Sequence, residues 1–427
     1  MKRALIITYY WPPAGGPGVQ RWLKFATYFR EYGVDPVVYI PKNPHYPILD
    51  NSMVLEVPQG IEIIKTTIKE PNRFSSIFLN KKARLISSGI IAKKKQSLTE
   101  KLMLWVRGNF FIPDTRVGWV KPSVAYLQNY LSENLVDIVI TTGPPHSLHL
   151  IGLELKKTLN IPWLADFRDP WTTIYYHKFM RLSNASVKKH KQLEANVLNS
   201  ADGIVVTSPT TKKEFEKITK SPIDVITNGY DISEDIIPVM DSSFSLVHVG
   251  SLLSERNPII LWEVLSEICK ENISFSEDFK LKLIGTVSEE ILISLKQYDL
   301  KDKCEVVGYV SHKEAQQLQH NAQLLLLIEM DRQETRSIIP GKLFEYIAAR
   351  RPIISLGPEG SDISSIISET YSGDFFTYGD GETLRLKILS YYAEFKRGNL
   401  KVIPENIEQY SRRVLTKKMT DLIKGMG

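Results

Sequence analysis

The sequence predicts an α/β protein made of two tandem domains, each with a parallel sheet. Three observations lead to this class. Short apolar runs alternate with amphipathic segments along nearly the whole chain, which is the pattern of βαβ units. A glycine-rich turn follows the first apolar run, and a second strand–loop–helix pattern starts at Leu246. The length of 427 residues also exceeds what one hydrophobic core usually supports.

Composition and charge narrow the function classes. The hydrophobic content of 43% and the charged content of 24% are ordinary for a globular protein. The formal charge of +6 permits anionic ligands or a membrane surface and does not indicate nucleic-acid binding. Cys269 and Cys304 lie far apart without metal-ligand spacing, so we expect a reducing, cytoplasmic compartment. No apolar run approaches the ~20 residues that a membrane span requires.

The chain opens with a βαβ unit whose first turn is rich in glycine. We expect a buried strand at Arg3–Tyr9, a helix at Val19–Tyr32 and a second strand at Pro36–Ile40. The turn contains Gly15 and Gly16 but lacks the G-x-G-x-x-G spacing, and no acidic residue ends the second strand. A dinucleotide dehydrogenase is therefore disfavoured. The two glycines allow backbone N–H groups to approach a ligand closely.

Residues 72–116 have a different character, because basic and apolar side chains are interleaved there. Trp105, Phe110 and Phe111 are among the apolar residues, and Glu100 is the one acidic residue between positions 81 and 107. Two interpretations remain open: a surface that lies on anionic lipid, or a basic helical insertion with one solvated face. The basic residues are Lys81, Lys82, Arg84, Lys93, Lys94, Lys95, Lys101 and Arg107.

His146 follows the strand predicted at Asp137–Thr142, in the turn where the next helix begins. Open α/β sheets place ligands at the carboxyl ends of their strands, so His146 is a candidate functional residue. The alternative is that His146 only caps or packs against the helix. His149, one turn later, is expected to pack.

The strand that begins at Ile161 ends in a charged loop with the sequence Asp166-Phe167-Arg168-Asp169. Alternation places Asp166 and Arg168 on one side of the strand and Asp169 on the other. These charged side chains are candidates for binding a ligand. An internal Arg–Asp pair that only holds the loop is the alternative for at least one carboxylate.

The second half repeats the alternation of strands and helices. A turn at 227–231 is the expected hinge, which gives an N-terminal domain over 1–229 and a C-terminal domain over 230–427. We expect ligands in a cleft between them, at the carboxyl ends of both sheets. A final amphipathic helix at 408–423 can pack back on the N-terminal domain. The expected strands are Leu246–Val249, Phe279–Ile284, Cys304–Val307, Leu324–Ile328 and Ile353–Leu356.

A loop–helix–strand segment organises the C-terminal domain. Pro340 and Gly341 break the chain before a run of helix formers that starts at Lys342. A helix entered in this way leaves N–H groups unpaired at its positive end, which suits a phosphate. Lys342 lies in the first turn, where the helix dipole disfavours a cation unless an anion is present. Glu345 can accept hydrogen bonds from sugar hydroxyls. An ordinary helix start with solvated side chains is the alternative.

Four motifs, taken together and in order, resemble a known family. They are Gly15-Gly16 followed by Val19, Leu23 and Ala26; Thr142-Gly143-Pro144-Pro145-His146-Ser147; Asp166-Phe167-Arg168-Asp169-Pro170-Trp171; and Pro340-Gly341-Lys342-Leu343-Phe344-Glu345-Tyr346. The chain resembles retaining glycosyltransferases of the GT-B fold, close to family 4, in a branch found in bacterial surface-polysaccharide clusters. The resemblance extends over nearly the whole length and implies two tandem Rossmann-like domains.

The resemblance implies transfer of a sugar from a nucleotide-diphosphate donor to a hydroxyl of a glycan or lipid-linked glycan, with retention at the anomeric carbon. It implies no cofactor besides this co-substrate, and a cytoplasmic site that can touch the inner face of the membrane. The implied catalytic residues are His146, Arg256, Lys342 and Glu345. The implied acceptor-side residues are His146, Arg168 and Asp169. The implied donor-binding residues are Gly15, Gly16, Gly250, Ser251, Arg256, Gly285, Tyr309, Val310, Pro340, Gly341, Lys342 and Glu345.

This chain departs from the family pattern at two places. Ser337 stands where the family has the first glutamate of a Glu–seven residues–Glu motif, and only Glu345 remains. The family's Arg and Lys after the first C-terminal strand correspond best to Ser251 and Asn257, which leaves Arg256 as the nearby cation. The sequence contains no Asp-x-Asp, so we expect cations in place of a metal ion. A sugar-nucleotide epimerase and a non-catalytic nucleotide-sugar-binding partner of a transferase remain alternatives.

Overall fold

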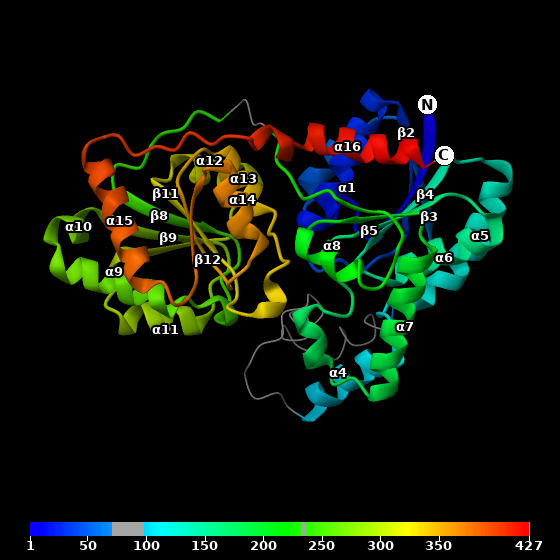
Figure 1. Ribbon diagram of the computed structural model, residues 1–427, viewed down its shortest axis with the longest axis horizontal. Coiled ribbons are helices and arrows are strands. Elements are labelled where there is room, and N and C mark those ends of the chain that lie inside the picture. Colours follow the sequence, from blue (N-terminus) through cyan, green and yellow to red (C-terminus); the bar gives the residue numbers. More distant parts are fainter. Residues whose placement is uncertain (71–97, 232–235, 427) are drawn as a thin grey trace. The chain divides into compact units, whose positions relative to one another are not determined.

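The computed structural model describes residues 1–70, 98–231 and 236–426 (Figure 1). The chain divides into two compact units. Unit 1 contains Met1–Thr227 and Arg412–Gly427, and unit 2 contains Asn228–Ser411. Both are α/β units with parallel sheets, as the sequence predicts.

The described part of unit 1 contains a parallel sheet of order β3-β2-β1-β4-β5-β6-β7. Its strands are β1 (Lys2–Ile7), β2 (Val34–Pro41), β3 (Glu62–Thr66), β4 (Ile138–Gly143), β5 (Trp163–Phe167), β6 (Gly203–Val206) and β7 (Ile223–Val225). Its helices are α1 (Pro17–Tyr28), α4 (Leu98–Phe110), α5 (Val120–Glu133), α6 (Ser147–Leu159), α7 (Asn184–Ser200), α8 (Pro209–Phe215) and α16 (Arg412–Gly425).

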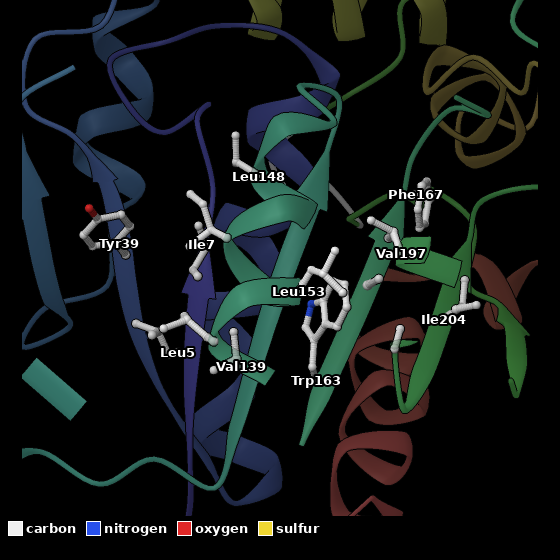
Figure 2. Close-up of a cluster of buried hydrophobic side chains, with 14 of the residues drawn as sticks. Leu5, Ile7, Tyr39, Val139, Leu148, Leu153, Trp163, Phe167, Val197 and Ile204 are labelled. Atoms are coloured by element: carbon white, nitrogen blue, oxygen red, sulfur yellow. The ribbon is translucent and has the colours of Figure 1, made fainter. Parts of the chain in front are cut away.

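Two apolar clusters cover the two faces of this sheet, because successive side chains of a strand point to opposite faces. Leu5 and Ile7 of β1 pack with α5, α6 and α7 in one cluster, which Figure 2 shows. Ala4 and Ile6 pack in the other cluster with α1 and α16. Helix α16 thus lies beside α1 although it ends the chain (Figure 1). It begins at Arg412, after a short 3₁₀ turn at Ile407–Tyr410, and not at 408.

The described part of unit 2 contains a parallel sheet of order β10-β9-β8-β11-β12-β13. Its strands are β8 (Phe244–Val249), β9 (Phe279–Ile284), β10 (Cys304–Gly308), β11 (Leu324–Ile328), β12 (Ile353–Leu356) and β13 (Gly373–Phe376). Its helices are α9 (Ile259–Glu271), α10 (Ile273–Asp278), α11 (Glu289–Gln297), α12 (His312–Asn321), α13 (Lys342–Ala348), α14 (Asp362–Thr370) and α15 (Gly381–Lys396). Helices α13 and α14 pack on one face of the sheet, and α9, α11 and α15 on the other.

Each sheet has one point at which the strand order reverses direction. In unit 1 this switch point lies between β1 and β4, and in unit 2 between β8 and β11. Open α/β sheets bind ligands outside the carboxyl ends of the strands at such points. Candidate sites are therefore expected after β1 and β4, and after β8 and β11.

Two predictions about membranes depend on these elements. No helix within the described ranges is both long and apolar enough to cross a bilayer. The basic segment predicted at 72–116 is described only from Leu98 onward. Lys81, Lys82, Arg84, Lys93, Lys94 and Lys95 lie outside the described residues.

Candidate active site

Three glycines shape the carboxyl edge of the sheet in unit 2. Gly250, Gly285 and Gly308 follow or end β8, β9 and β10, and all have positive φ, at 111°, 116° and 83°. The amide of Gly250 donates to the carbonyl of Ile284 at 2.7 Å. A Cβ on Gly285 would lie 2.7 Å from the carbonyl oxygen of Gly250. Only glycine permits both this backbone conformation and this close approach of the two loops.

Lys342 and Arg256, which the sequence singled out, lie close to each other beside these loops. Lys342 begins α13, and its Nζ lies 3.3 Å from Nε2 of His248. The pKa of Lys342 is lowered to about 7, mainly by burial and in addition by the charge of Arg256, against the opposing effect of Glu329 and Glu345. Two cations are therefore brought together at the switch point of unit 2.

Glu329 holds Arg256, a role that was not predicted. It directly follows β11, and its side chain is almost fully buried. Nη2 of Arg256 lies 3.2 Å from each carboxylate oxygen of Glu329. A charged residue directly after a fully apolar strand was the signal that could have identified Glu329.

His248 orients Lys342, and it too was missed. It is fully buried in the central strand β8, with Nδ1 2.9 Å from the carbonyl oxygen of Leu326. A carbonyl only accepts, so Nδ1 carries the proton and Nε2 accepts from Lys342. Burial holds the pKa of His248 well below its usual value, and the charge of Lys342 acts in the same direction. His248 is therefore a neutral acceptor.

The two cations retain hydrogen-bonding capacity. Lys342 has three N–H groups, of which one is directed at His248. Nε of Arg256 is buried and has no partner within the described ranges. A buried donor without an acceptor is costly, and an anion beside it removes this cost. The pair therefore suits a diphosphate.

The start of α13 offers fewer free amides than expected. Leu343 N donates to Pro340 O at 3.0 Å, and Phe344 N donates to Gly341 O at 3.2 Å. The expectation that the amides at this helix start are unpaired is wrong for these two, because i→i+3 bonds tighten the first turn. Glu345 accepts at 3.0 Å from Nε2 of the buried Gln319.

The remaining donor-side candidates of unit 2 differ in accessibility. Ser251 is exposed and Val310 is partly buried. The side chain of Tyr309 is 80% exposed, so that only its backbone lies at the sheet edge. Ser337 is buried. Asn257 accepts from Trp262 and donates to Ser294, so this side chain serves the fold.

In unit 1, Asp166 is a structural residue. Its carboxylate is fully buried and accepts from Arg21 Nη2 at 2.9 Å, Trp22 Nε1 at 2.8 Å and Thr142 Oγ1 at 2.8 Å. Asp166 thus forms an internal Arg–Asp pair, which was the alternative for at least one carboxylate of this loop, but its partner is Arg21 of α1, which the loop sequence alone does not reveal. Arg21 also donates to the carbonyl of Thr227 at 2.6 Å.

Arg168 and Asp169 follow β5, and the side chain of Arg168 reaches the segments after β1 and β4 at the switch point of unit 1. Arg168 donates to the carbonyl of Pro144, and its guanidinium lies against Gly18, where any Cβ would collide with it. Burial lowers the pKa of Arg168, whereas the charge of Asp169 raises it. Burial raises the pKa of Asp169, and Arg168 opposes this shift. Gly16 precedes α1 with φ of 100°.

Gly15 fixes the loop in front of α1. Its amide donates to Ile48 O at 3.0 Å. A Cβ on Gly15 would lie 3.0 Å from the Ile48 side chain and 3.2 Å from that of Asp50. Gly15 is therefore held by the loop after β2, whereas its neighbour Gly16 provides the positive φ that starts the helix.

His146 occupies the position directly before α6, and its ring stacks on Trp171 with centroids 5.0 Å apart and an interplanar angle of 4°. It is 7% exposed, and neither ring nitrogen has a partner within the described residues. Burial, followed by the nearby His149, holds the pKa of His146 well below 6.5. His146 is therefore neutral at pH 7, with one donor and one acceptor nitrogen.

Asp114 caps the helix that follows His146. Its carboxylate accepts from Ser147 N and from Ser147 Oγ, both at 2.8 Å. No side chain of α6 itself provides this cap. Across the described ranges, no group of three or more His, Cys, Asp or Glu side chains is arranged to hold a metal ion.

These two units define the GT-B fold, and comparison with solved structures agrees. The lipopolysaccharide outer core galactosyltransferase WaaB has a TM-score of 0.61 at 14% identity, with 100% of this chain and 99% of that chain covered. HepE of Anabaena, solved in complex with UDP-glucose, has a TM-score of 0.61 at 11% identity and full coverage of both chains. TarM of S. aureus, solved with UDP and a glycan, has a TM-score of 0.58 at 11% identity, with 99% of this chain and 100% of that chain covered.

The family model for Glycosyltransferase Family 4 matches residues 90–234. The resemblance to GT-B glycosyltransferases close to family 4, inferred from four motifs, is thereby confirmed. A search of curated proteins found no match.

Proposed function

We propose that the protein transfers a sugar from a nucleotide-diphosphate donor to a hydroxyl of a glycan or lipid-linked glycan, with retention of anomeric configuration, in cell-surface polysaccharide biosynthesis. The observation that carries this proposal is the pair of Arg256 and Lys342, whose free N–H groups lie at the switch point of a GT-B unit. The family match and the nucleotide-sugar complex of HepE support it.

In the proposed reaction the bond from the anomeric carbon to the diphosphate breaks, and a bond to the acceptor oxygen forms on the same face. A leaving phosphate oxygen takes the proton of the acceptor hydroxyl. Negative charge grows on the diphosphate in the transition state, so Arg256 and Lys342 stabilise that state more than the ground state. Their two charges replace a metal ion in this proposal.

The remaining predicted site residues are assigned to parts of the donor or to the acceptor. We assign the donor base to the backbone at Tyr309 and Val310, and the ribose to Glu345, whose carboxylate Gln319 holds in place. On unit 1 we assign Arg168 and Asp169 to the acceptor. His146 serves as a hydrogen-bonding group and not as a base, because burial holds its pKa well below the usual value and so makes its ring a weak proton acceptor.

Variants of the two cations test the proposal. Arg256→Ala or Lys342→Ala removes a charge-assisted hydrogen bond, so kcat/KM should fall roughly ten- to a hundredfold. Arg397→Ala is the matched control, because Arg397 pairs only with Glu394 on the surface of α15. Steady-state transfer assays measure the effect. Unchanged turnover in both site variants contradicts the assignment of the diphosphate.

A ligand screen separates the proposal from its alternatives. Nucleoside diphosphates and their sugars should raise the Tm, since a ligand that binds only the folded state stabilises it by mass action. The stabilising donor is then incubated with and without lipid-linked glycan. Acceptor-dependent release of nucleoside diphosphate, with a product of unchanged anomeric configuration by NMR, supports a retaining transferase. Epimerised donor without acceptor indicates an epimerase, and binding without turnover indicates a non-catalytic partner.

We also propose that the protein contacts anionic membrane through α4. Leu102, Trp105 and Phe110 recur at helical spacing and are 60%, 41% and 69% exposed. Asn109 anchors this helix, because its Oδ1 accepts from Ser183 N at 2.8 Å and from Ser186 Oγ at 2.7 Å. The adjoining helix α7 adds the exposed lysines Lys188, Lys189 and Lys191. Exposed aromatic residues beside lysines are typical of surfaces that bind anionic lipid.

Sedimentation with phosphatidylglycerol vesicles tests this contact. The protein should sediment at low salt and be released at high salt, because salt screens charge at the surface. The double variant Trp105→Ser/Phe110→Ser should lose binding at all salt concentrations. Leu135→Ser, at a site that is 82% exposed and outside α4, is the control. A parent protein that stays in the supernatant at low salt would remove the membrane from the proposal.

A further inference from the structure

Two histidine rings converge on one glycine at the carboxyl end of β4. A Cβ on Gly143 would lie 2.5 Å from Nε2 of His149 and 3.0 Å from Nδ1 of His146. Both nitrogens are buried and have no hydrogen-bond partner within the described ranges. Glycine at this position therefore leaves room for the edges of two imidazoles, and these edges face the same backbone atom.

A chain of hydrogen bonds leads to this point from the interior of the sheet. Trp163 Nε1 lies 2.9 Å from Thr141 Oγ1, and an indole N–H can only donate. Thr141 Oγ1 in turn lies 2.9 Å from Nδ1 of His149. A hydroxyl that accepts from Trp163 is still free to donate its own proton, and its donation to Nδ1 of His149 places the proton of the His149 ring on Nε2.

The plane of the His149 ring is fixed as well. The ring is fully buried and stacks on Phe167 with centroids 4.2 Å apart and an interplanar angle of 25°. Its Nε2–H cannot turn to another acceptor without losing this stacking and the bond to Thr141. The donor is therefore held beside Gly143, on the side where Nδ1 of His146 lies.

We infer that His149 is a positioning residue that fixes the tautomer of His146. The N–H of His149 favours a lone pair on Nδ1 of His146, and the proton of His146 then resides on Nε2. His146 thus presents an N–H donor to its ligand, a group that suits a hydroxyl or ring oxygen of a sugar. The tautomer is inferred from the contacts of His149, Thr141 and Gly143 without reference to the reaction, and only the identification of the ligand as a sugar rests on the proposed function.

The surroundings of His146 favour a neutral donor over a proton acceptor. The ring lies between Trp171 and Phe167, and the charged or titratable groups that act on it are His149, His177, Arg168 and His190. All four oppose a positive charge on His146, and burial does so most strongly. The imidazole therefore polarises a bound oxygen without removing a proton.

Nitrogen NMR on the full chain tests the tautomer directly. The protein is labelled with ¹⁵N-histidine, and the ring signals are assigned with His146→Gln and His149→Gln. Two-bond ¹H–¹⁵N correlations should show both rings with the proton on Nε2. Thr141→Val removes the hydroxyl that contacts His149 and does not itself touch the His146 ring, so the His146 pattern should shift toward a mixture. Thr158→Val, which removes an exposed hydroxyl from the same helix α6, should leave it unchanged.

Kinetics provide a second readout. Gln at position 149 keeps an amide N–H near the place of Nε2, whereas Leu does not. His149→Leu should lower kcat about tenfold with the KM for the donor unchanged, and His149→Gln should recover most of the loss. At saturating donor, which keeps Lys342 protonated through its diphosphate, the pH profile of kcat should be flat from pH 6 to 8 in the parent, as expected when His146 does not titrate there.

Two results would overturn the inference. One is a proton on Nδ1 of His146 in the parent protein, or a His146 pattern that Thr141→Val leaves unchanged. The other is an equal loss of kcat in His149→Gln and His149→Leu, which would reduce His149 to a packing residue. The NMR result decides the tautomer even if no sugar transfer is found, so it separates failure of this inference from failure of the proposed function.

Discussion

At the scale of single residues, Lys342 illustrates how burial changes the chemistry of a common surface cation. Its ordinary pKa of 10.5 falls to about 7 because it is enclosed and lies near Arg256. Its acidic neighbours, Glu329 and Glu345, only partly offset this shift. The ammonium is therefore partly deprotonated at neutral pH until an anion binds.

Diphosphate binding should consequently depend on pH. The anion binds the protonated amine, so the affinity for UDP should be highest below pH 7 and fall by up to tenfold per pH unit above it. Isothermal titration between pH 6 and 9 measures this dependence. Lys342→Met provides the control. This variant should bind UDP more weakly, and its affinity should not decline above pH 7, because only the phosphate of UDP itself still titrates. The same slope in both proteins would contradict the assignment of the shift to Lys342.

Asp166 should matter for stability more than any surface charge. Asp166→Ala leaves the buried guanidinium of Arg21 without its carboxylate, which typically costs about 3–5 kcal/mol in the free energy of unfolding. Glu31→Ala is the comparison, because its pair with Arg413 is exposed and such pairs contribute about 0–1 kcal/mol. Urea unfolding followed by circular dichroism measures both variants. Equal losses would mean that the buried network does not stabilise unit 1.

Residue types and spacing predicted some of the site but not its supporting groups. Arg256 and Lys342 were found because a cation beside a glycine loop or at a helix start has a clear physical meaning. His248, Glu329 and Arg21 were not found, since each acts through a partner that is distant in the sequence. Alternation along β5 placed the Asp166 side chain on a face but could not name its partner.

At the scale of elements, the buried strands were the most predictable. Three of them, β9, β11 and β12, have the predicted bounds, because β11 and β12 are apolar runs, β9 has apolar residues at alternate positions, and a polar residue, glycine or proline bounds each end. The strands β3, β6 and β13 were not identified. β3 and β13 lie at sheet edges and bury only part of their side chains, so their hydrophobic signal is weak. β6 is short, with four residues.

The last helix, α16, should be essential for unit 1. Leu415, Met419 and Ile423 are buried against α1, so a chain that stops at Ser411 would expose the cluster on that face of the sheet. Each such side chain stabilises the fold by about 1.5–3 kcal/mol. The truncated protein should aggregate or unfold at a much lower Tm in a thermal scan. Replacement of the exposed Lys417 and Lys418 by Ala should change the Tm little, and equal stability of truncated and full chains would contradict this role.

At the scale of the whole molecule, the order of units along the chain differs from a simple tandem. Unit 2 is inserted between Thr227 and Arg412 of unit 1. The sequence predicted an amphipathic final helix and the possibility that it returns to the N-terminal domain. The apolar stripe showed that this helix packs, but a stripe does not specify the surface that receives it. Only the tertiary structure assigns α16 to unit 1.

The two ends of unit 2 are hydrogen-bonded to each other. The amide of Tyr230 donates to the carbonyl of Tyr410 at 3.1 Å, and Tyr230 forms a β-bridge with Ser411. Because the first and last residues of unit 2 adjoin, this unit can be excised, circularly permuted or exchanged between homologous proteins at a single junction. Under the proposed function, laboratory chimaeras joined at this junction would combine the donor preference of one enzyme with the acceptor preference of another.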